Sequence, residues 1–172
     1  MLELRDWTDD DLPLLVRTVG DAEMMKHLGG PESVEKIHRR HEILLSVGPS
    51  GDGRAYTIRI GPEATVAGSI GFWESEFNGA AVYETGWMVL PEFGNRGIAT
   101  NAARIVIERA RAAGRHRYLH AFPDVANLPS NRVCAKAGFV DLGPCEVEYP
   151  LGTMMRANNW RFDLHPERAV SG

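Results

Sequence analysis

The stretch from Leu90 to Ala110, LPEFGNRGIATNAARIVIERA, joins the end of a predicted strand to the start of a predicted helix. Gly94, Asn95 and Gly97 lie at the junction. The first N–H groups of a helix have no acceptor within the helix, and the helix dipole adds about half a positive charge at that end. With glycines that admit close approach and Arg96 as a bidentate cation, the junction is expected to bind a phosphate. The alternative is a glycine turn that only connects strand to helix.

The spacing of these residues differs from two common phosphate-binding motifs. It lacks the Lys-Ser/Thr of a Walker loop and does not fit the G-x-G-x-x-G of a dinucleotide site. The segment VLPEFGNRGIAT instead resembles the acyl-CoA pyrophosphate loop of the GNAT superfamily of N-acetyltransferases, Gln/Arg-x-x-Gly-x-Gly/Ala after V-x-P-x-(Tyr/Phe). Gly97 and Ala99 match the two later fixed positions. Gly94 replaces the usual Gln or Arg, so a side-chain contact to the pyrophosphate is either missing or supplied by Arg96.

A second segment, NLPSNRVCAKAGF from Asn127 to Phe139, resembles the other CoA-contacting motif of this superfamily, Asn-x-x-Ser-x-x-x-x-x-Lys-x-Gly-Phe. The resemblance implies that Asn127 bonds the pantetheine arm and that Ser130 lies near the thiol end. Helix capping is the alternative role for both residues. The resemblance covers residues 2–164 and is greatest to the branch that contains the ribosomal-protein alanine N-acetyltransferases. That branch also holds small-molecule and self-resistance acetyltransferases, so the substrate stays open.

The resemblance implies direct attack by a substrate amine on the thioester of acetyl-CoA, in a ternary complex. It also implies that pantetheine lies along the strand YETGWMVL, whose Met88 or Val89 N–H stabilises the oxyanion. The residues expected to contact acetyl-CoA are Met88, Val89, Leu90, Gly94, Asn95, Arg96, Gly97, Ile98, Ala99, Thr100, Asn127, Ser130 and Arg132.

An ammonium group must lose a proton before it can attack, and Glu84 is the first candidate for the base. Strand alternation places Glu84, Gly86 and Met88 on one face, which would line the cleft if the arrangement of the superfamily holds. A carboxylate in an apolar strand must be compensated or have a raised pKa, and a raised pKa suits a general base. The alternative is a salt-bridged or solvent-facing carboxylate. His120, in the next predicted strand, is the second candidate because imidazole titrates near neutrality, with a structural histidine as its alternative.

The CoA thiolate must take up a proton, and the sequence offers more than one donor for it. Many members of the superfamily carry Tyr where this sequence has Cys134, and we expect Cys134 to pack within its helix. Ser130 or water is then the donor, or the thiolate leaves without a dedicated acid. The catalytic candidates are therefore Glu84, Ser130 and His120.

The elements that must position these residues follow the order βααβββαβαββ, and the 172 residues are expected to form one acetyltransferase domain, 1–172. This order predicts an α/β (α+β) fold. The resemblance implies the GNAT fold, with a central mixed, mostly antiparallel sheet of about seven strands, about four flanking helices, and strands 4 and 5 splayed apart. Residues 21–47 are expected to form a helix broken at residues 29–31. Residues 48–54 are predicted to form a turn, and residues 165–172 to be unstructured.

The composition of the chain limits the classes of molecule that it is expected to bind. A net charge of −4 argues against a nucleic-acid binder, and small or cationic partners fit better. No apolar run approaches the roughly 20 residues of a membrane span, and the acidic N-terminus is unlike a signal peptide. Cys134 and Cys145 lack metal-ligand spacing and favour a reducing compartment. We expect a cytoplasmic protein that uses acetyl-CoA and an amine, needs no metal, binds neither nucleic acid nor membranes, and forms a homodimer if it follows many members of the superfamily.

Two other functions remain open at this point. One is transfer of a longer acyl group such as succinyl. The other is a non-catalytic acyl-CoA-binding regulator, which the departure at Gly94 keeps in consideration.

Overall fold

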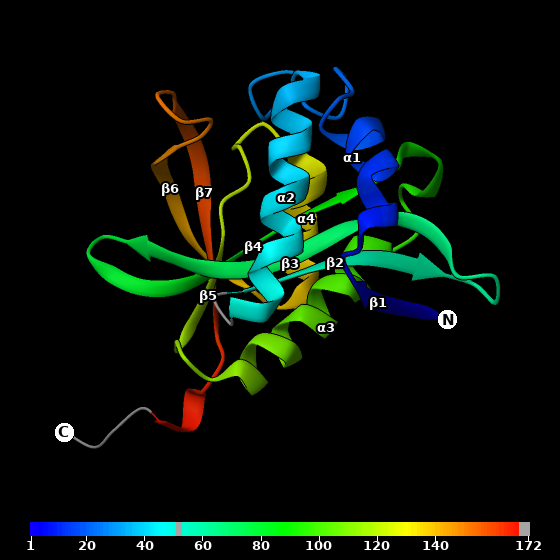
Figure 1. Cartoon of the computed structure of the whole chain (residues 1–172). Coiled ribbons are helices and arrows are strands. Elements are labelled where there is room, and N and C mark those ends of the chain that lie inside the picture. Colours follow the sequence, from blue (N-terminus) through cyan, green and yellow to red (C-terminus); the bar gives the residue numbers. More distant parts are fainter. Residues whose placement is uncertain (51–52, 169–172) are drawn as a thin grey trace.

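The computed structural model describes residues 1–50 and 53–168. Strands and helices follow one another in the order predicted from the sequence (Figure 1). Their bounds are β1 Leu2–Asp6, α1 Leu12–Thr18, α2 Val34–Ser50, β2 Gly53–Ile60, β3 Thr65–Phe77, β4 Ala80–Val89, α3 Ile98–Ala113, β5 Tyr118–Ala121, α4 Leu128–Ala137, β6 Val140–Glu148 and β7 Met154–Asp163. Short 3₁₀ turns are formed by Asp9–Asp11, Pro91–Phe93 and Pro166–Arg168.

The strands form one mixed sheet in the order β1-β2-β3-β4-β5-β7-β6. Neighbouring strands are antiparallel except β4 and β5, which run parallel. The β4–β5 ladder is short: Tyr83 lies opposite Leu119 and Glu84 opposite His120. On its other edge, β4 pairs with β3 along its whole length. The predicted splay between the fourth and fifth strands is therefore confirmed, because the ladder ends where β4 continues.

The sheet is covered on both faces (Figure 1). Helices α3 and α4 pack on one face, where Ala102, Val106 and Cys134 are fully buried against sheet residues such as Tyr83. Helices α1 and α2 pack on the other face around a second cluster of buried apolar side chains: Trp7, Leu14, Leu15, Val19, Met25, Ile37, Ala55 and Leu90. Successive residues of a strand therefore face different helix layers, because side chains alternate between the two faces of a pleated sheet.

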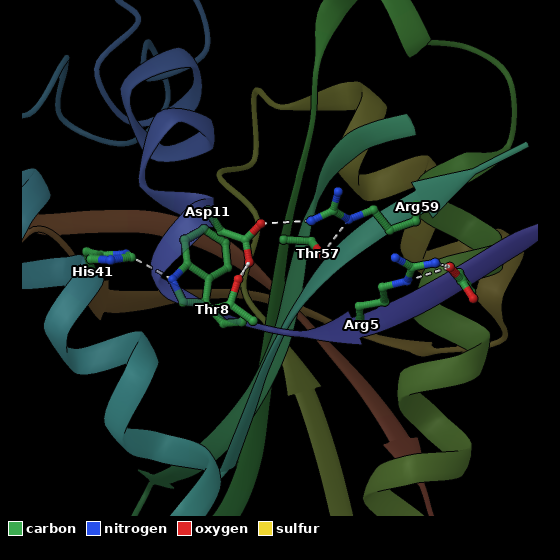
Figure 2. Close-up of polar contacts among 8 residues, drawn as sticks. Arg5, Thr8, Asp11, His41, Thr57 and Arg59 are labelled. Carbon is green, nitrogen blue, oxygen red and sulfur yellow. Dashed lines mark hydrogen bonds and ion pairs between the residues drawn. The ribbon is translucent and has the colours of Figure 1, made fainter. Parts of the chain in front are cut away.

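Polar contacts connect the α1–α2 layer to the edge of the sheet (Figure 2). Buried Asp11 accepts hydrogen bonds from the backbone N–H of Thr8 at 2.8 Å and from the Thr8 hydroxyl at 3.0 Å. Its second oxygen accepts from Nη2 of Arg59 on β2 at 2.9 Å. The indole N–H of Trp7 donates to Nδ1 of His41 on α2 at 3.0 Å. These bonds join the end of β1 to both β2 and α2.

The segment before α2 differs from its prediction. Residues 22–28 form successive turns instead of the first piece of a helix. The Asp21 carboxylate accepts the N–H of Met24 at 2.8 Å, and Gly29 and Gly30 have positive φ angles of 90° and 85°. Only a short segment separates Asp21 from Gly29 and Gly30, which interrupt a helix. A helix in this segment would form too few hydrogen bonds to offset its cost of nucleation.

Two further predictions, for the end of α2 and for the C-terminal tail, also differ from the structure. Helix α2 continues through residues 48–50, which were predicted to form a turn. Gly48 and Pro49 both disfavour a helix, so its continuation through these residues runs against their local preference. Residues 51–52 of the predicted turn lie outside the described residues, and residues 53–54 belong to β2 instead of the turn. Residues 166–168 form a 3₁₀ turn within the tail predicted to be unstructured, and residues 169–172 lie outside the described part of the chain.

In the described ranges, no helix combines the length and the apolar character that crossing a membrane requires. The same residues contain no group of three His, Cys, Asp or Glu side chains placed to hold a metal ion.

Candidate active site

The loop between β4 and α3 alternates between ordinary and left-handed backbone. Gly94 is extended, with φ −62° and ψ 157°, whereas Asn95 and Gly97 have positive φ angles of 58° and 73°. Asn tolerates this region better than most residues and Gly adopts it freely. Helix α3 begins immediately afterwards, at Ile98. Left-handed residues in such a turn direct successive N–H groups to one side, which forms an anion-binding concavity.

The backbone N–H groups of this loop divide into bonded and unbonded sets. Gly94 N–H donates to the carbonyl of Pro91 at 3.0 Å, and Asn101 N–H donates to the carbonyl of Gly97 at 3.0 Å. Between them, the N–H groups of residues 95–100 have no acceptor among the described residues. We call residues 95–100 the phosphate loop. The amide of Gly94 is engaged elsewhere, in a tight turn of the chain, although Gly94 was expected to contact CoA.

Arg96 adds a side-chain cation to the phosphate loop. Its guanidinium carbon lies 5.9 Å from the centre of the Phe93 ring, and the side chain is exposed. Within the described residues it forms no ion pair with a carboxylate. Beside it lies an open depression of about 660 Å³, which Phe93, Ile98 and Asn101 also line. An unpaired guanidinium at a helix N-terminus suits a bidentate contact to phosphate.

The free edge of β4 leads toward this loop. The N–H of Leu90 donates to the carbonyl of Ala67, at the β3 edge, at 2.8 Å. Backbone groups alternate in direction along a strand, so the N–H of Met88 also points toward β3 and that of Val89 points toward the gap beside β5. Of the two candidate oxyanion donors, Val89 is therefore the one whose N–H is directed into the splay.

Glu84 lies on the face of the sheet that carries α1 and α2. Its partner on β3 is Trp73, and the Ser75 hydroxyl donates to its Oε2 at 3.0 Å. Burial raises the pKa of the Glu84 carboxyl above its ordinary value, while hydrogen bonds from Ser75 and Trp73 act in the opposite direction. The side chain has no cation partner in the described residues, so the salt-bridged alternative does not hold here.

His120 is the cross-strand neighbour of Glu84. It is 4% exposed, and its Nδ1 lies 2.7 Å from Oδ1 of Asn159 on β7. Burial lowers the pKa of His120 below its ordinary value; the hydrogen bond to Asn159 opposes this, and the charge of Arg161 adds to it. The structure thus brings together the two residues that the sequence named as alternative bases, one on each strand of the parallel β4–β5 pair.

Asn127 and Ser130 meet in a helix cap at the start of α4. The Asn127 Oδ1 accepts the N–H of Ser130 at 3.3 Å, which is the capping role considered for them. The Asn127 Nδ2 and the Ser130 hydroxyl have no partner among the described residues and stay available to a ligand. Arg132 is exposed on the same helix.

Sequence reasoning missed Asn131, which lies inside the same motif. Its Nδ2 donates to the carbonyls of Asp124 and Asn127, at 3.0 and 2.8 Å. Its Oδ1 accepts from Asn158 and Trp160 of β7, at 2.7 and 2.8 Å. The available signal was its spacing, because Asn131, Cys134 and Ala137 recur every three residues on the buried side of α4.

Cys134 is a packing residue, as expected from the sequence. Its side chain is fully buried, and burial raises the pKa of the thiol to about 12. A thiol with so high a pKa and no solvent contact is poorly suited to return a proton to a thiolate. Ser130 and water are the donors that remain.

This chain is similar to known proteins in sequence and in fold. The family model described as "Acetyltransferase (GNAT) domain" matches residues 1–140. A curated relative, the uncharacterized N-acetyltransferase YnaD of Bacillus subtilis (strain 168), is 25% identical over 138 residues, which are 80% of this chain and 78% of the relative.

Two solved structures share the fold. A ribosomal-protein-S5-alanine acetyltransferase from Vibrio fischeri has a TM-score of 0.77 at 16% identity, covering 96% of this chain and 94% of the other. A spermidine N-acetyltransferase from Vibrio cholerae, solved in complex with CoA and spermine, has a TM-score of 0.75 at 14% identity and covers 95% of each chain. Since the family model spans well over half of the 172 residues, the chain belongs to the GNAT acetyltransferase family.

Proposed function

We propose that this protein is an N-acetyltransferase that transfers the acetyl group of acetyl-CoA to a primary amine by direct attack in a ternary complex. The observation that carries this proposal is the row of unbonded N–H groups at residues 95–100, at the start of α3 and beside the open edge of β4. The N–H groups, the helix dipole and the unpaired Arg96 all favour a diphosphate. Asn127 and Ser130, across the gap on α4, supply polar groups for the pantetheine arm.

The residues of the site divide the chemistry among them. Bound acetyl-CoA supplies a thioester carbonyl that an amine can attack. Val89 donates its N–H to the carbonyl oxygen as negative charge develops there. Glu84 accepts a proton from the substrate ammonium, which frees the nitrogen lone pair. The new N–C bond forms as the C–S bond breaks, and Ser130 or water supplies the proton that the departing sulfur takes up.

The test is a transfer assay on the full chain with acetyl-CoA and a panel of amines. The panel includes spermine and peptides with an N-terminal alanine, because proteins of this fold are named for polyamine and ribosomal-protein alanine substrates. We expect release of free CoA and a product heavier by one acetyl group with at least one amine. Succinyl-CoA, run in parallel, tests the acyl group.

Thermal unfolding with CoA separates the possible failures. Saturation at 100 times the dissociation constant should stabilise the fold by about 2.7 kcal/mol. Stabilisation without transfer to any amine would identify a non-catalytic acyl-CoA binder. No stabilisation would refute the CoA site itself.

A further inference from the structure

We propose that His120 is a second proton acceptor of the site, beside Glu84, and that Asn159 is the positioning residue that turns the free nitrogen of the imidazole toward the reaction. The inference rests on the proposed function, since it concerns the same acetyl transfer. Glu84 and His120 are then not alternative bases, because each of them accepts one proton.

The sheet places the two groups side by side. Glu84 and His120 are direct partners in the parallel β4–β5 ladder, so their side chains leave the sheet on the same face. The preceding pair, Tyr83 and Leu119, is fully buried on the opposite face, beneath α3. The ladder ends at Glu84, so both groups stand at the apex of the splay, where the open edge of β4 begins.

Asn159 fixes the tautomer of the imidazole. An amide oxygen can only accept a hydrogen bond, so the 2.7 Å contact with Oδ1 of Asn159 requires that Nδ1 of His120 carry the proton. The other nitrogen, Nε2, then has a lone pair and can act as a base. Asn159 is itself 7% exposed, which holds the contact out of competition with water.

The environment of Nε2 completes the assignment of the two ring nitrogens. His120 Nε2 has no hydrogen-bond partner among the described residues. The nitrogen without a partner is thus the one that Asn159 leaves unprotonated.

Aromatic rings hold the imidazole in place. Phe122 stacks on it with ring centres 5.5 Å apart and an angle of 17°, and the Phe77 ring is centred 5.4 Å away. The titratable and charged groups that face it are Glu84 on β4, Tyr118 on β5 and Arg161 on β7. Burial and the Arg161 charge favour the neutral ring, the form that can accept a proton.

The stoichiometry of the reaction provides a proton for each of the two groups. A primary ammonium carries three N–H bonds and the amide product carries one, so two protons leave the nitrogen in each turnover. One of them ends on the departing sulfur and the other in solvent. Glu84 takes the proton that frees the lone pair, and Nε2 of His120 takes the second proton once the N–C bond has formed.

Histidine tautomers can be measured without substrate, by long-range proton–nitrogen spectra of the ¹⁵N-labelled protein at neutral pH. We expect the Nδ1–H form for His120, assigned by the loss of its signals in His120→Gln. Asn159→Ala should convert His120 to a mixture of tautomers. Asn158→Ala is the matched control, because the side chain of the adjacent Asn158 donates to Asn131 instead and its loss should leave the His120 signals unchanged. An Nε2–H form in the wild type would overturn the proposal.

Kinetics then test the division of work. If both groups must be unprotonated, the acid limb of log kcat/KM against pH has a slope near two in the wild type and near one in His120→Gln or Glu84→Gln. His120→Gln should lower kcat about 10²-fold, and Asn159→Ala by about tenfold, with the dissociation constant of CoA unchanged. An unaltered slope and kcat in His120→Gln would overturn the role of His120. Failure of every amine in the wild type would refute the proposed function, whereas the tautomer result would stand independently.

Discussion

Glu84 shows how one residue in the site is tuned by two opposing effects. Burial raises the pKa of its carboxyl, and hydrogen bonds from Ser75 and Trp73 restrain that rise. A base of this kind is protonated at low pH and becomes active as pH rises through its raised pKa. The strand pattern predicts the face on which Glu84 lies, but the neighbours that tune it come from β3 and β5 and depend on strand pairing.

Glu84→Gln removes the carboxylate while keeping its size. We expect kcat to fall about 10²–10³-fold at neutral pH, because general-base catalysis is lost. Isothermal titration should give a nearly unchanged dissociation constant for CoA, since the phosphate loop is untouched. Wild-type turnover in this variant would exclude Glu84 as the base.

Ser75→Ala removes a hydrogen bond that stabilises the ionised carboxylate. Its loss should raise the pKa of Glu84 further, so the acid limb of kcat/KM moves to higher pH while the rate at the alkaline plateau changes little. Ser69→Ala is the matched control, because Ser69 lies on the same face of β3 opposite Met88. An acid limb that stays in place in Ser75→Ala, or that moves equally in Ser69→Ala, would contradict this mechanism.

At the scale of elements, the β4–α3 junction was predictable and the segment before α2 was not. Glycines at residues 94 and 97, followed by helical periodicity, are local signals, and α3 begins and ends where they indicate. The turns at residues 22–28 depend on tertiary contacts, since Met25 is buried in the core and a Cβ on Gly29 would lie 2.8 Å from Pro150. Sequence periodicity carries no information on such distant packing.

Helix α3 offers a matched pair of glycines for testing the phosphate loop. Gly97 before the helix has φ 73° and ψ 7°, and Gly114 after it has φ 71° and ψ 7°. Any side chain at either position strains the backbone by roughly 1–2 kcal/mol. Gly97→Glu also places a carboxylate beside the unbonded N–H groups and should abolish stabilisation by CoA. Gly114→Glu should lower the melting temperature similarly but respond to CoA like the wild type. An equal CoA response in both variants would exclude the loop as the site.

At the scale of the whole molecule, the strand order could be anticipated only through the resemblance of two short motifs to a known family. The order β1-β2-β3-β4-β5-β7-β6 brings Glu84 of β4, His120 of β5 and Asn159 of β7 together. Asn159 gave no signal in the sequence, because its partner lies 39 residues away along the chain. The same holds for Asp11 and Arg59, which link the start of α1 to β2.

Asp11→Ala should destabilise the fold by about 2–3 kcal/mol, because it leaves the partly buried Arg59 unpaired and removes two bonds to Thr8. Chemical denaturation measures this change. Asp10→Ala, at the exposed neighbouring residue, is the control and should change stability by less than about 0.5 kcal/mol. Equal effects of the two substitutions would show that Asp11 does not anchor the layer.

The central claim is that the backbone N–H groups of residues 95–100 bind the diphosphate of CoA. The most direct measurement is a titration of the ¹⁵N-labelled protein, with the amide resonances of this loop followed in proton–nitrogen spectra. We expect large shifts of these amides with CoA and none with pantetheine, which lacks the diphosphate. Loop amides that stay in place at saturating CoA would contradict the claim.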